Sequence, residues 1–295
     1  MVRHALAVFG FLPLLALATV AAAEEKVLFQ KASPYNTVIV TENERGLRTL
    51  RFEQGGARQS VVKVGDPDHL ELPYASVMPV GLAFVEKPRQ VLVVGLGGGT
   101  VPSFLHKHFP SMHLDVVDID PVVVQVAKEF FGFREDDRLR AYAEDGRKFI
   151  EQRPRRYDII FLDAFGAENV PYHLATREFL ESVRAALTPE GIVVGNIWSR
   201  SSNPLYDSMV RTYQEVFPEV TIFHVRGVSN RIVVGVPRRQ PVDKQDLTRR
   251  AREISTQSQF GFDLGDVVNY GFREAAEERT GGRVLRDEDQ QRKAG

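Results

Sequence analysis

Residues 91–105 read VLVVGLGGGTVPSFL, in which a run of apolar residues is followed by a glycine turn and a helical pattern. The apolar run is typical of a parallel strand covered on both faces. Glycines after such a strand let the chain turn tightly and approach a ligand without a Cβ in the way. The glycines of this turn are Gly95, Gly97, Gly98 and Gly99. Asp118 ends the next apolar run about 20 residues further on, where nucleotide-binding folds place the carboxylate that binds a ribose diol. The spacing predicts a nucleoside-binding half-domain, the alternative being a turn whose glycines serve only packing.

Strands and helices are predicted to alternate through the middle of the chain. Strands are predicted at 90–94, 113–118, 139–143, 157–163 and 191–197. Helices are predicted at 100–109, 121–131, 146–152, 175–187 and 205–217. This alternation is typical of a doubly wound α/β sheet. The β-rich runs 220–225 and 231–236 then predict an antiparallel hairpin, a feature of the methyltransferase-type Rossmann-like fold.

The chain before this domain has a different pattern. Residues 26–64 form short alternating segments separated by turn signals, which predict a small N-terminal antiparallel β-domain. A mixed helical pattern over 69–84, interrupted by Pro79, leads to the first core strand. Beyond Pro237 a charged helix is predicted near 243–254, and a frayed tail from Arg273 onward. The predicted division is a signal peptide (1–23), the β-domain with its linker (24–86), the Rossmann-like transferase domain (87–260) and a charged tail (261–295).

Residues 1–23 have the pattern of a secretory signal peptide. Arg3 and His4 precede an apolar run over 5–20, and three alanines, 21–23, stand before two glutamates. Small residues at this position suit a signal peptidase, and the apolar run is short for a stable membrane span. We expect cleavage before Glu24 and a periplasmic or secreted protein with no membrane attachment after cleavage. An uncleaved membrane anchor is the alternative.

Composition excludes several classes of function. The 38 Lys and Arg residues nearly cancel the 39 Asp and Glu residues, so no overall field attracts a nucleic acid. The absence of cysteine excludes disulfides, thiolate metal sites and cysteine nucleophiles. The motifs of α/β-hydrolases, P-loop proteins and zincins are missing from the sequence.

Three carboxylates follow predicted parallel strands and are expected to meet in one crevice, because ligands of doubly wound sheets bind at the carboxyl ends of the strands. Asp118 suits ribose hydroxyls. Asp145, which precedes Gly146, can accept a hydrogen bond from an adenine amino group or cap the next helix. Asp163 follows an apolar strand, where a carboxylate can hold a cation or take a proton from an amine. Capping of the following loop is its alternative role.

Other polar residues are expected to have structural roles. Asp120 precedes Pro121 and is predicted to cap a helix N-terminus. Trp198 follows the fifth strand and can cover a ligand or pack in the core. Three histidines lie on or just after one helix with no carboxylate at ligand spacing, so we expect no metal site. They are His106, His108 and His113.

The order of these motifs resembles the polyamine aminopropyltransferase family, the spermidine synthase-like proteins, over roughly residues 26–236. VLVVGLGGGT stands at the family's GGGDGG loop, VVDID at its second strand end, AEDG at its third, and LDAFGAENVPYHLATREFL at its catalytic segment. The resemblance implies that Asp118 binds ribose, Asp145 the adenine edge and Asp163 the attacking amine. It further implies that Tyr74, in LPYA, packs at the substrate amine, and that Gln59, in RQS, reaches the nucleoside.

The chain also departs from the family's pattern. Gly98 stands where the family has the aspartate that binds the donor's aminopropyl amine, and Gly166 replaces a second catalytic aspartate. Ala75 and Ser76 replace the histidine and glutamate that follow the tyrosine. A diamine needs a carboxylate at each buried ammonium, so the acceptor site is altered. Carboxylates from loops can substitute; the candidates are Asp66, Asp68 and Glu168.

These observations favour a spermidine synthase-like transferase that moves an aminopropyl group from decarboxylated S-adenosylmethionine to a polyamine or other amine, without a metal. A homodimer is a possible assembly. One alternative is a methyltransferase that uses S-adenosylmethionine, because Gly98 no longer excludes the donor's carboxylate. Another is a catalytically silent exported protein that binds a nucleoside or a polyamine.

Overall fold

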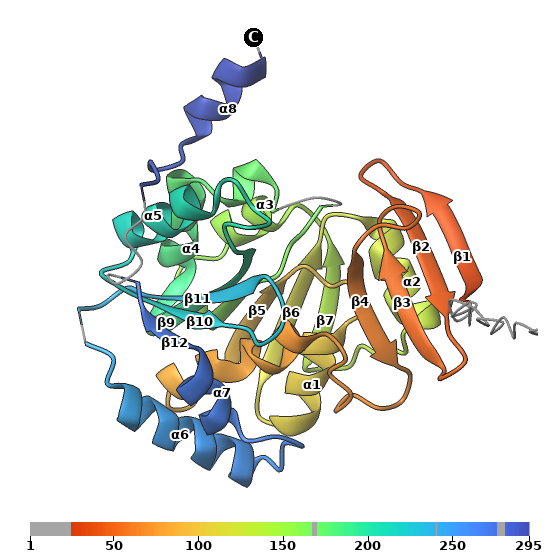
Figure 1. Ribbon diagram of the computed structural model, residues 1–295, viewed down its shortest axis with the longest axis horizontal. Coiled ribbons are helices and arrows are strands. Elements are labelled where there is room, and N and C mark those ends of the chain that lie inside the picture. Colours follow the sequence, from red (N-terminus) through yellow and green to blue (C-terminus); the bar gives the residue numbers. More distant parts are fainter. Residues whose placement is uncertain (1–24, 167–169, 240, 276–280, 295) are drawn as a thin grey trace, which may run out of the picture.

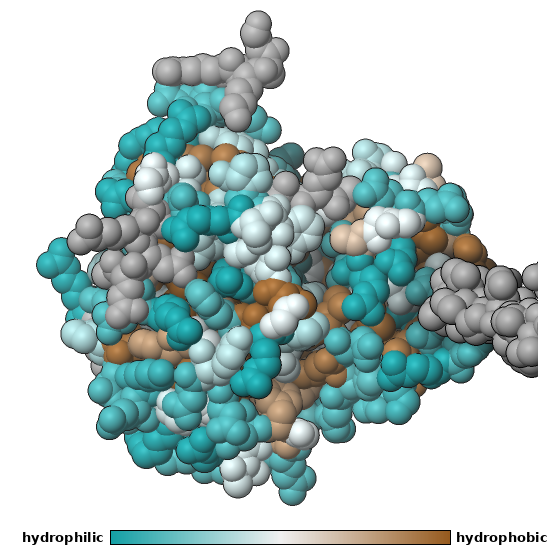
Figure 2. Space-filling view, in the orientation of Figure 1, coloured by the Kyte–Doolittle hydropathy of each residue, from teal (hydrophilic) through white to brown (hydrophobic). Residues whose placement is uncertain are grey.

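The computed structural model describes residues 25–166, 170–239, 241–275 and 281–294, and arranges them around two β-sheets (Figure 1). The smaller sheet lies at one end of the molecule and the larger one forms its centre. Hydrophilic residues cover most of the face in Figure 2, α6 included, and apolar residues are exposed where the two parts meet. The predicted signal peptide lies outside the described residues.

The N-terminal sheet is a four-stranded antiparallel meander. Its strands, in order, are β1 (Lys26–Ala32), β2 (Thr37–Glu42), β3 (Leu47–Arg51) and β4 (Arg58–Lys63). Val38, Val40 and Leu50 are fully buried on one face and pack against Val123 and Val126 of helix α2 (Pro121–Phe130). The N-terminal sheet therefore packs around a separate apolar core, to which helix α2 of the larger domain contributes.

The central sheet has the order β12-β10-β11-β9-β8-β5-β6-β7. Its parallel strands are β5 (Gln90–Val94), β6 (His113–Asp118), β7 (Leu139–Ala143), β8 (Tyr157–Leu162) and β9 (Leu187–Trp198). β11 (Asn230–Val236) pairs antiparallel with β9 and with β10 (Glu219–His224). The α/β class, the small N-terminal sheet and the antiparallel last strands confirm the predicted fold.

Helices cover both faces of the central sheet. On one face lie α1 (Thr100–His108), α6 (Lys244–Gln257) and α7 (Leu264–Gly271). On the other lie α3 (Gly146–Glu151), α4 (Arg177–Ala186) and α5 (Tyr206–Val216). Strand residues such as Val91, Leu92 and Ile160 are inaccessible to solvent because each face has its own apolar cluster. The near-continuous apolar runs of these strands follow from this burial on both sides.

Two connecting regions differ from their predictions. The pattern over 69–84 forms two 3-10 helices, η1 (Pro73–Ser76) and η2 (Met78–Phe84), because prolines stand near both starts. The charged tail is wrong as a description of residues 261–275, since Leu264 and Val268 are fully buried in α7 and β12 (Phe272–Glu274) pairs with β10. Further on, Leu285 is buried and α8 (Asp287–Ala294) follows.

Among the described residues, no helix combines the length and apolar character needed to span a membrane.

Candidate active site

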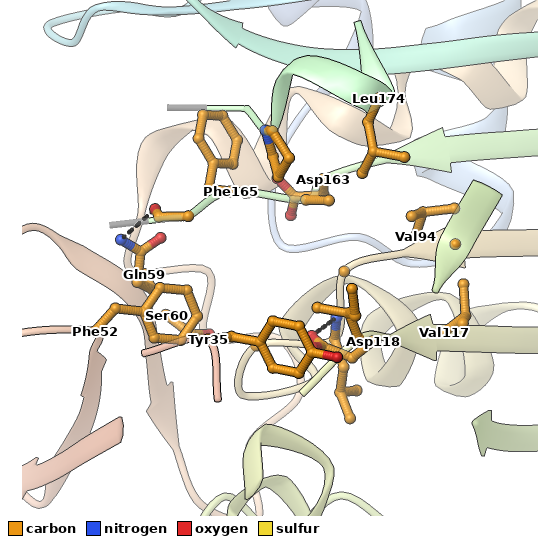
Figure 3. A pocket seen from close by; sticks show the side chains of 18 of the residues that line it. Tyr35, Phe52, Gln59, Ser60, Val94, Val117, Asp118, Asp163, Phe165 and Leu174 are labelled. Carbon is orange, nitrogen blue, oxygen red and sulfur yellow. Dashed lines mark hydrogen bonds between the residues drawn. The ribbon is translucent and has the colours of Figure 1, made fainter. Parts of the chain in front are cut away.

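A cavity of about 430 Å³ opens at the carboxyl ends of β5, β6, β7 and β8, and the N-terminal sheet faces it (Figure 3). The crevice lies where a doubly wound sheet binds its ligand. The residues that the sequence placed in one site and that line this cavity are Gln59, Tyr74, Gly95, Gly97, Asp118, Asp145, Gly146 and Asp163. Their individual roles in binding and catalysis stay predictions.

The glycine turn between β5 and α1 divides into two parts. Gly95 has a φ of +99°, and a Cβ there would lie 2.3 Å from the backbone oxygen of Asp163, so only glycine fits. Gly98 and Gly99 differ from their prediction, because they line a separate hollow behind the turn. A Cβ on Gly98 would meet Ser60 Oγ at 2.9 Å, and one on Gly99 would meet a ring carbon of Phe133 at 2.7 Å. These two glycines serve close packing.

Asp118 organises the glycine turn from the end of β6. Its two carboxylate oxygens accept hydrogen bonds from the N–H groups of Leu96, at 2.9 Å, and Asp120, at 3.0 Å. Burial raises the pKa of Asp118, opposed by these backbone hydrogen bonds. A carboxylate oxygen has more than one acceptor position, so the group can hold the turn and still bind hydroxyls in the cavity.

Asp145 has the predicted capping role, and its side chain also lines the cavity. Oδ1 caps α3 by accepting from the N–H groups of Arg147, at 2.9 Å, and Lys148, at 3.1 Å. Oδ2 lies 3.3 Å from Nε2 of His173, which comes from η3 (Tyr172–Leu174) and lines the same cavity. The cap fixes one carboxylate oxygen, while the other remains at the cavity wall.

Asp163 is the carboxylate with the most altered acidity in the site. Burial raises the pKa of Asp163 to about 7, against hydrogen bonds from Asn196 and Tyr74 that lower it. Asn196 Nδ2 donates to Asp163 Oδ1 at 2.8 Å, and Asn230 Nδ2 donates to Asn196 Oδ1 at 2.9 Å. Burial likewise raises the pKa of Tyr74, so its hydroxyl stays protonated and can donate to the carboxylate. The arrangement holds a base whose charge changes near neutral pH.

Gln59 connects the N-terminal sheet to the residues around Asp163. Its side-chain amide donates to the backbone oxygen of Gly166 at 3.5 Å, as Figure 3 shows, and its backbone oxygen lies 3.5 Å from the Tyr74 hydroxyl oxygen. Gln59 therefore links β4 to the segment after β8.

Several residues in or behind the cavity wall were missed in the sequence. Asn196, which donates to Asp163 from β9, is 2% exposed, and an amide within an apolar strand is the signal that indicates it. Tyr35, Phe52 and Phe165 line the cavity itself, but nothing in the local sequence distinguishes them from core residues. Trp198 packs on Phe165, with ring centroids 5.4 Å apart, and so supports the wall.

The proposed substitute carboxylates lie elsewhere or outside the described residues. Asp68 contacts Lys107 and His108, and Asp66 contacts Lys63. Glu168 lies outside the described residues. His106 contacts Asp136, and among the described residues no group of three or more potential ligands gathers to hold a metal.

The charge of the cavity is one-sided. Its described lining contains Asp118, Asp145 and Asp163, but no lysine or arginine. His173 is the one lining residue in that set that can become cationic, and it faces Asp145. Apolar side chains such as Val94 and Leu174 complete the wall. Such a cavity favours a positively charged ligand with an apolar or aromatic part.

Comparison with known proteins relates the chain to a group of transferases. The sequence pattern of the spermine/spermidine synthase domain matches residues 73–229, more than half of the chain. The chain is 35% identical to the polyamine aminopropyltransferase of Vibrio vulnificus over 240 residues, which cover 79% of each protein.

Two solved structures are similar in fold. A probable spermidine synthase from Corynebacterium glutamicum superposes with a TM-score of 0.71 at 19% identity, covering 88% of this chain and 96% of that one. Human methyltransferase-like protein 13, in complex with SAH, superposes with a TM-score of 0.58 at 30% identity. That alignment covers 64% of this chain and 93% of the human chain.

Proposed function

Because this chain belongs to the spermine/spermidine synthase family, we propose that it transfers an aminopropyl group from decarboxylated S-adenosylmethionine to an amine. The family relationship makes the protein a transferase. Beyond the family relationship, we propose which group is transferred, which donor supplies it and which class of acceptor receives it.

The proposed donor is inferred from the charge of the cavity. Decarboxylated S-adenosylmethionine has a sulfonium and an ammonium but no carboxylate, so it is purely cationic. The described lining offers three carboxylates and no lysine or arginine that would pair with a donor carboxylate. A charge taken from water without a partner is costly, so this lining favours the decarboxylated donor.

Asp163 supplies the chemistry that the transfer needs. The lone pair of the acceptor nitrogen attacks the carbon of the aminopropyl group that is bonded to sulfur. As the new C–N bond forms, the C–S bond breaks, its electron pair returns to the sulfonium, and methylthioadenosine leaves. The nitrogen gives up a proton to Asp163, whose raised pKa of about 7 makes it a stronger base than an ordinary aspartate.

Methyl transfer is the second candidate, and one residue favours it. The glycine turn gives the cavity no carboxylate for the donor's aminopropyl amine, because Gly98 has no side chain and lies in the hollow behind the turn, where its Cβ position is closed by Ser60. The similarity to human methyltransferase-like protein 13, at 30% identity, fits the same alternative. In that reading the donor is S-adenosylmethionine, and the acidic cavity must accommodate its carboxylate through backbone N–H groups.

Calorimetric titration with three nucleosides decides between the candidates. We expect decarboxylated S-adenosylmethionine to bind more tightly than S-adenosylmethionine, with methylthioadenosine also binding as the product. The reverse order of the two donors would support methyl transfer. No heat from any of the three would leave a structural role or polyamine binding as the function.

A transfer assay tests the role of Asp163. Labelled donor is offered with putrescine, agmatine and a panel of monoamines to the wild type and to Asp163→Asn. General bases contribute roughly 10²–10⁴-fold to rate, so the variant is expected to lose at least about 99% of turnover while binding methylthioadenosine normally. Equal rates in both proteins would remove Asp163 from the mechanism. No transfer by the wild type to any amine would contradict the proposed activity.

A further inference from the structure

The C-terminal strap, which we define as residues 281–290, is anchored on α4 and α5. Leu285 is 1% exposed in the apolar cluster on that face of the sheet. Its N–H donates to Thr212 Oγ1 at 3.0 Å, and its carbonyl accepts from the N–H of Arg177 at 2.8 Å. A Cβ on Gly282 would lie 2.2 Å from the carbonyl carbon of Asp207, so the strap lies directly on the first turn of α5. Figure 1 shows α8 projecting beyond these anchors.

Asp287, at the start of α8, connects the strap to α3. Its carboxylate accepts hydrogen bonds from both terminal nitrogens of Arg147, at 2.9 and 2.7 Å. The Arg147 guanidinium lowers the pKa of Asp287, so the carboxylate is ionised at neutral pH. A bidentate pair fixes the arginine in direction as well as in distance. Arg147 follows Gly146, which lines the cavity directly after the Asp145 cap.

Arg147 and the strap also contact η3, which forms one wall of the cavity together with the start of α3. Arg147 donates to the backbone oxygen of His173 at 3.5 Å. The Tyr172 hydroxyl donates to the backbone oxygen of Arg286 in the strap at 3.2 Å. His173 in turn faces Asp145 at 3.3 Å. The strap thus holds both segments that form this wall, the start of α3 and η3.

We propose that the C-terminal strap completes the nucleoside end of the cavity, with Asp287 as a positioning residue that acts through Arg147 on Asp145 and His173. The proposal rests on the proposed function in that the cavity is taken to bind an adenosyl nucleoside. Groups held in place before binding lose less freedom when the ligand arrives, so nucleoside affinity depends on the strap. At the cavity, the described contacts of the strap reach α3 and η3 and not Asp163. Binding of the acceptor amine beside Asp163 should therefore not depend on the strap.

Titration with methylthioadenosine tests this dependence. In Asp287→Ala we expect the Kd to rise at least about fivefold, the lower range of coupling between sites. The matched control is Glu151→Gln, because Glu151 also pairs with Arg147, at 3.0 Å, from within α3. The control should keep its Kd within about twofold of the wild type. An unchanged Kd in Asp287→Ala, or an equal loss in Glu151→Gln, would overturn the proposal.

A double-mutant cycle tests whether Asp287 acts through Arg147. Arg147→Ala combined with Asp287→Ala should bind no more weakly than Arg147→Ala alone, because the second change then removes nothing further. Independent, additive losses would contradict this route. Asp287→Asn, which keeps the size of the side chain, replaces Asp287→Ala should the latter fail to fold. We expect the KM of the acceptor amine to stay unchanged in each variant that folds.

Hydrogen exchange without ligand separates this proposal from the proposed function. Amides of 172–176 should exchange faster in Asp287→Ala than in the wild type and Glu151→Gln, while those of β5 and β8 stay protected. Equal protection in all three proteins would overturn the role of the strap. A wild type that binds no methylthioadenosine would contradict the proposed function, and the exchange result would then judge the strap alone.

Discussion

Asp163 gains its basicity from being placed where its charge is disfavoured. Loss of hydration raises its pKa to about 7, and the Asn196 amide and Tyr74 hydroxyl offset only part of this effect. The carboxylate accepts from Asn196 on one oxygen, so its direction is fixed before a substrate arrives. The described cavity lining has no lysine or arginine to stabilise the ionised carboxylate. A cationic ligand bound in the cavity can supply that positive charge.

This placement predicts a pH dependence of stability. The pKa of Asp163 is raised in the folded protein, so between about pH 4 and pH 7 the folded state holds a proton that the unfolded state releases. The free energy of unfolding of the wild type should therefore fall as pH rises through this window, by up to about 4 kcal/mol. Asp163→Asn lacks this contribution. Urea denaturation of both proteins from pH 4 to 8 checks it, and a constant difference between the two would contradict it.

A second prediction concerns Asp118. Asp118→Asn should weaken methylthioadenosine binding by about 2 kcal/mol, the range of hydrogen bonds to charged groups. It should also lower Tm, because the carboxylate accepts from Leu96 and Asp120. Asp115→Asn is the matched control, since Asp115 lies in the same strand and binds the Tyr157 hydroxyl instead. A lower Tm with unchanged affinity in Asp118→Asn would limit Asp118 to its structural role.

Helix α2 shows how one element joins the two sheets. Asp120 is 1% exposed, caps α2 by accepting from the N–H of Val122 at 2.9 Å, and also accepts from the Ser33 hydroxyl of the N-terminal region. The predicted cap is therefore present. Its contact with Ser33 depends on the packing of the two parts and has no signal in the local sequence.

Removal of this cap should have a measurable cost. Asp120→Ala is expected to lower the free energy of unfolding by about 1–2 kcal/mol, because a cap and a buried hydrogen bond are both lost. Asp120→Asn should recover most of it, since the amide can accept from Val122 and donate to Ser33. Ser33→Ala measures the contact between the two parts alone. Urea unfolding of the three variants checks the order, and a fully stable Asp120→Ala would contradict it.

The elements that the sequence predicted well are those with strong periodicity. β6 and β7 coincide with their predicted bounds, and α1 and α2 end one residue earlier than predicted. Two-sided burial gives such strands unbroken apolar runs. The helix and strand over 264–274 and the burial of Leu285 were missed because they depend on a few apolar residues among many charges. Their burial is decided by α5 and β10, far away in the sequence.

At the scale of the whole molecule, the cavity lies between parts that the sequence can only describe separately. The strand-end acids could be predicted because parallel strands bring their carboxyl ends to one edge. The contributions of Phe52 and Gln59 need the N-terminal sheet to face that edge, and this depends on packing against α2. The polar chain from Asn230 through Asn196 likewise requires β11 to lie beside β9.

We also propose that the chain is exported, on the signal-peptide pattern of residues 1–23. Glu25, the first described residue, contacts the N-terminal sheet through its side chain. It accepts from Thr41 Oγ1 at 2.7 Å and from Arg51 at 3.3 Å. Cleavage before Glu24 would therefore leave these contacts of Glu25 in the mature protein.

N-terminal sequencing of protein from its native host tests export. We expect the soluble protein to begin at Glu24, because small residues at Ala21 and Ala23 suit a signal peptidase. Substituting both alanines by leucine should block cleavage and leave the precursor attached to the membrane by its apolar segment. A soluble cytoplasmic protein that retains Met1 would overturn this proposal. It would also place the transferase beside the cytoplasmic source of adenosyl donors, whereas an exported protein needs its donor delivered outside the cytoplasm.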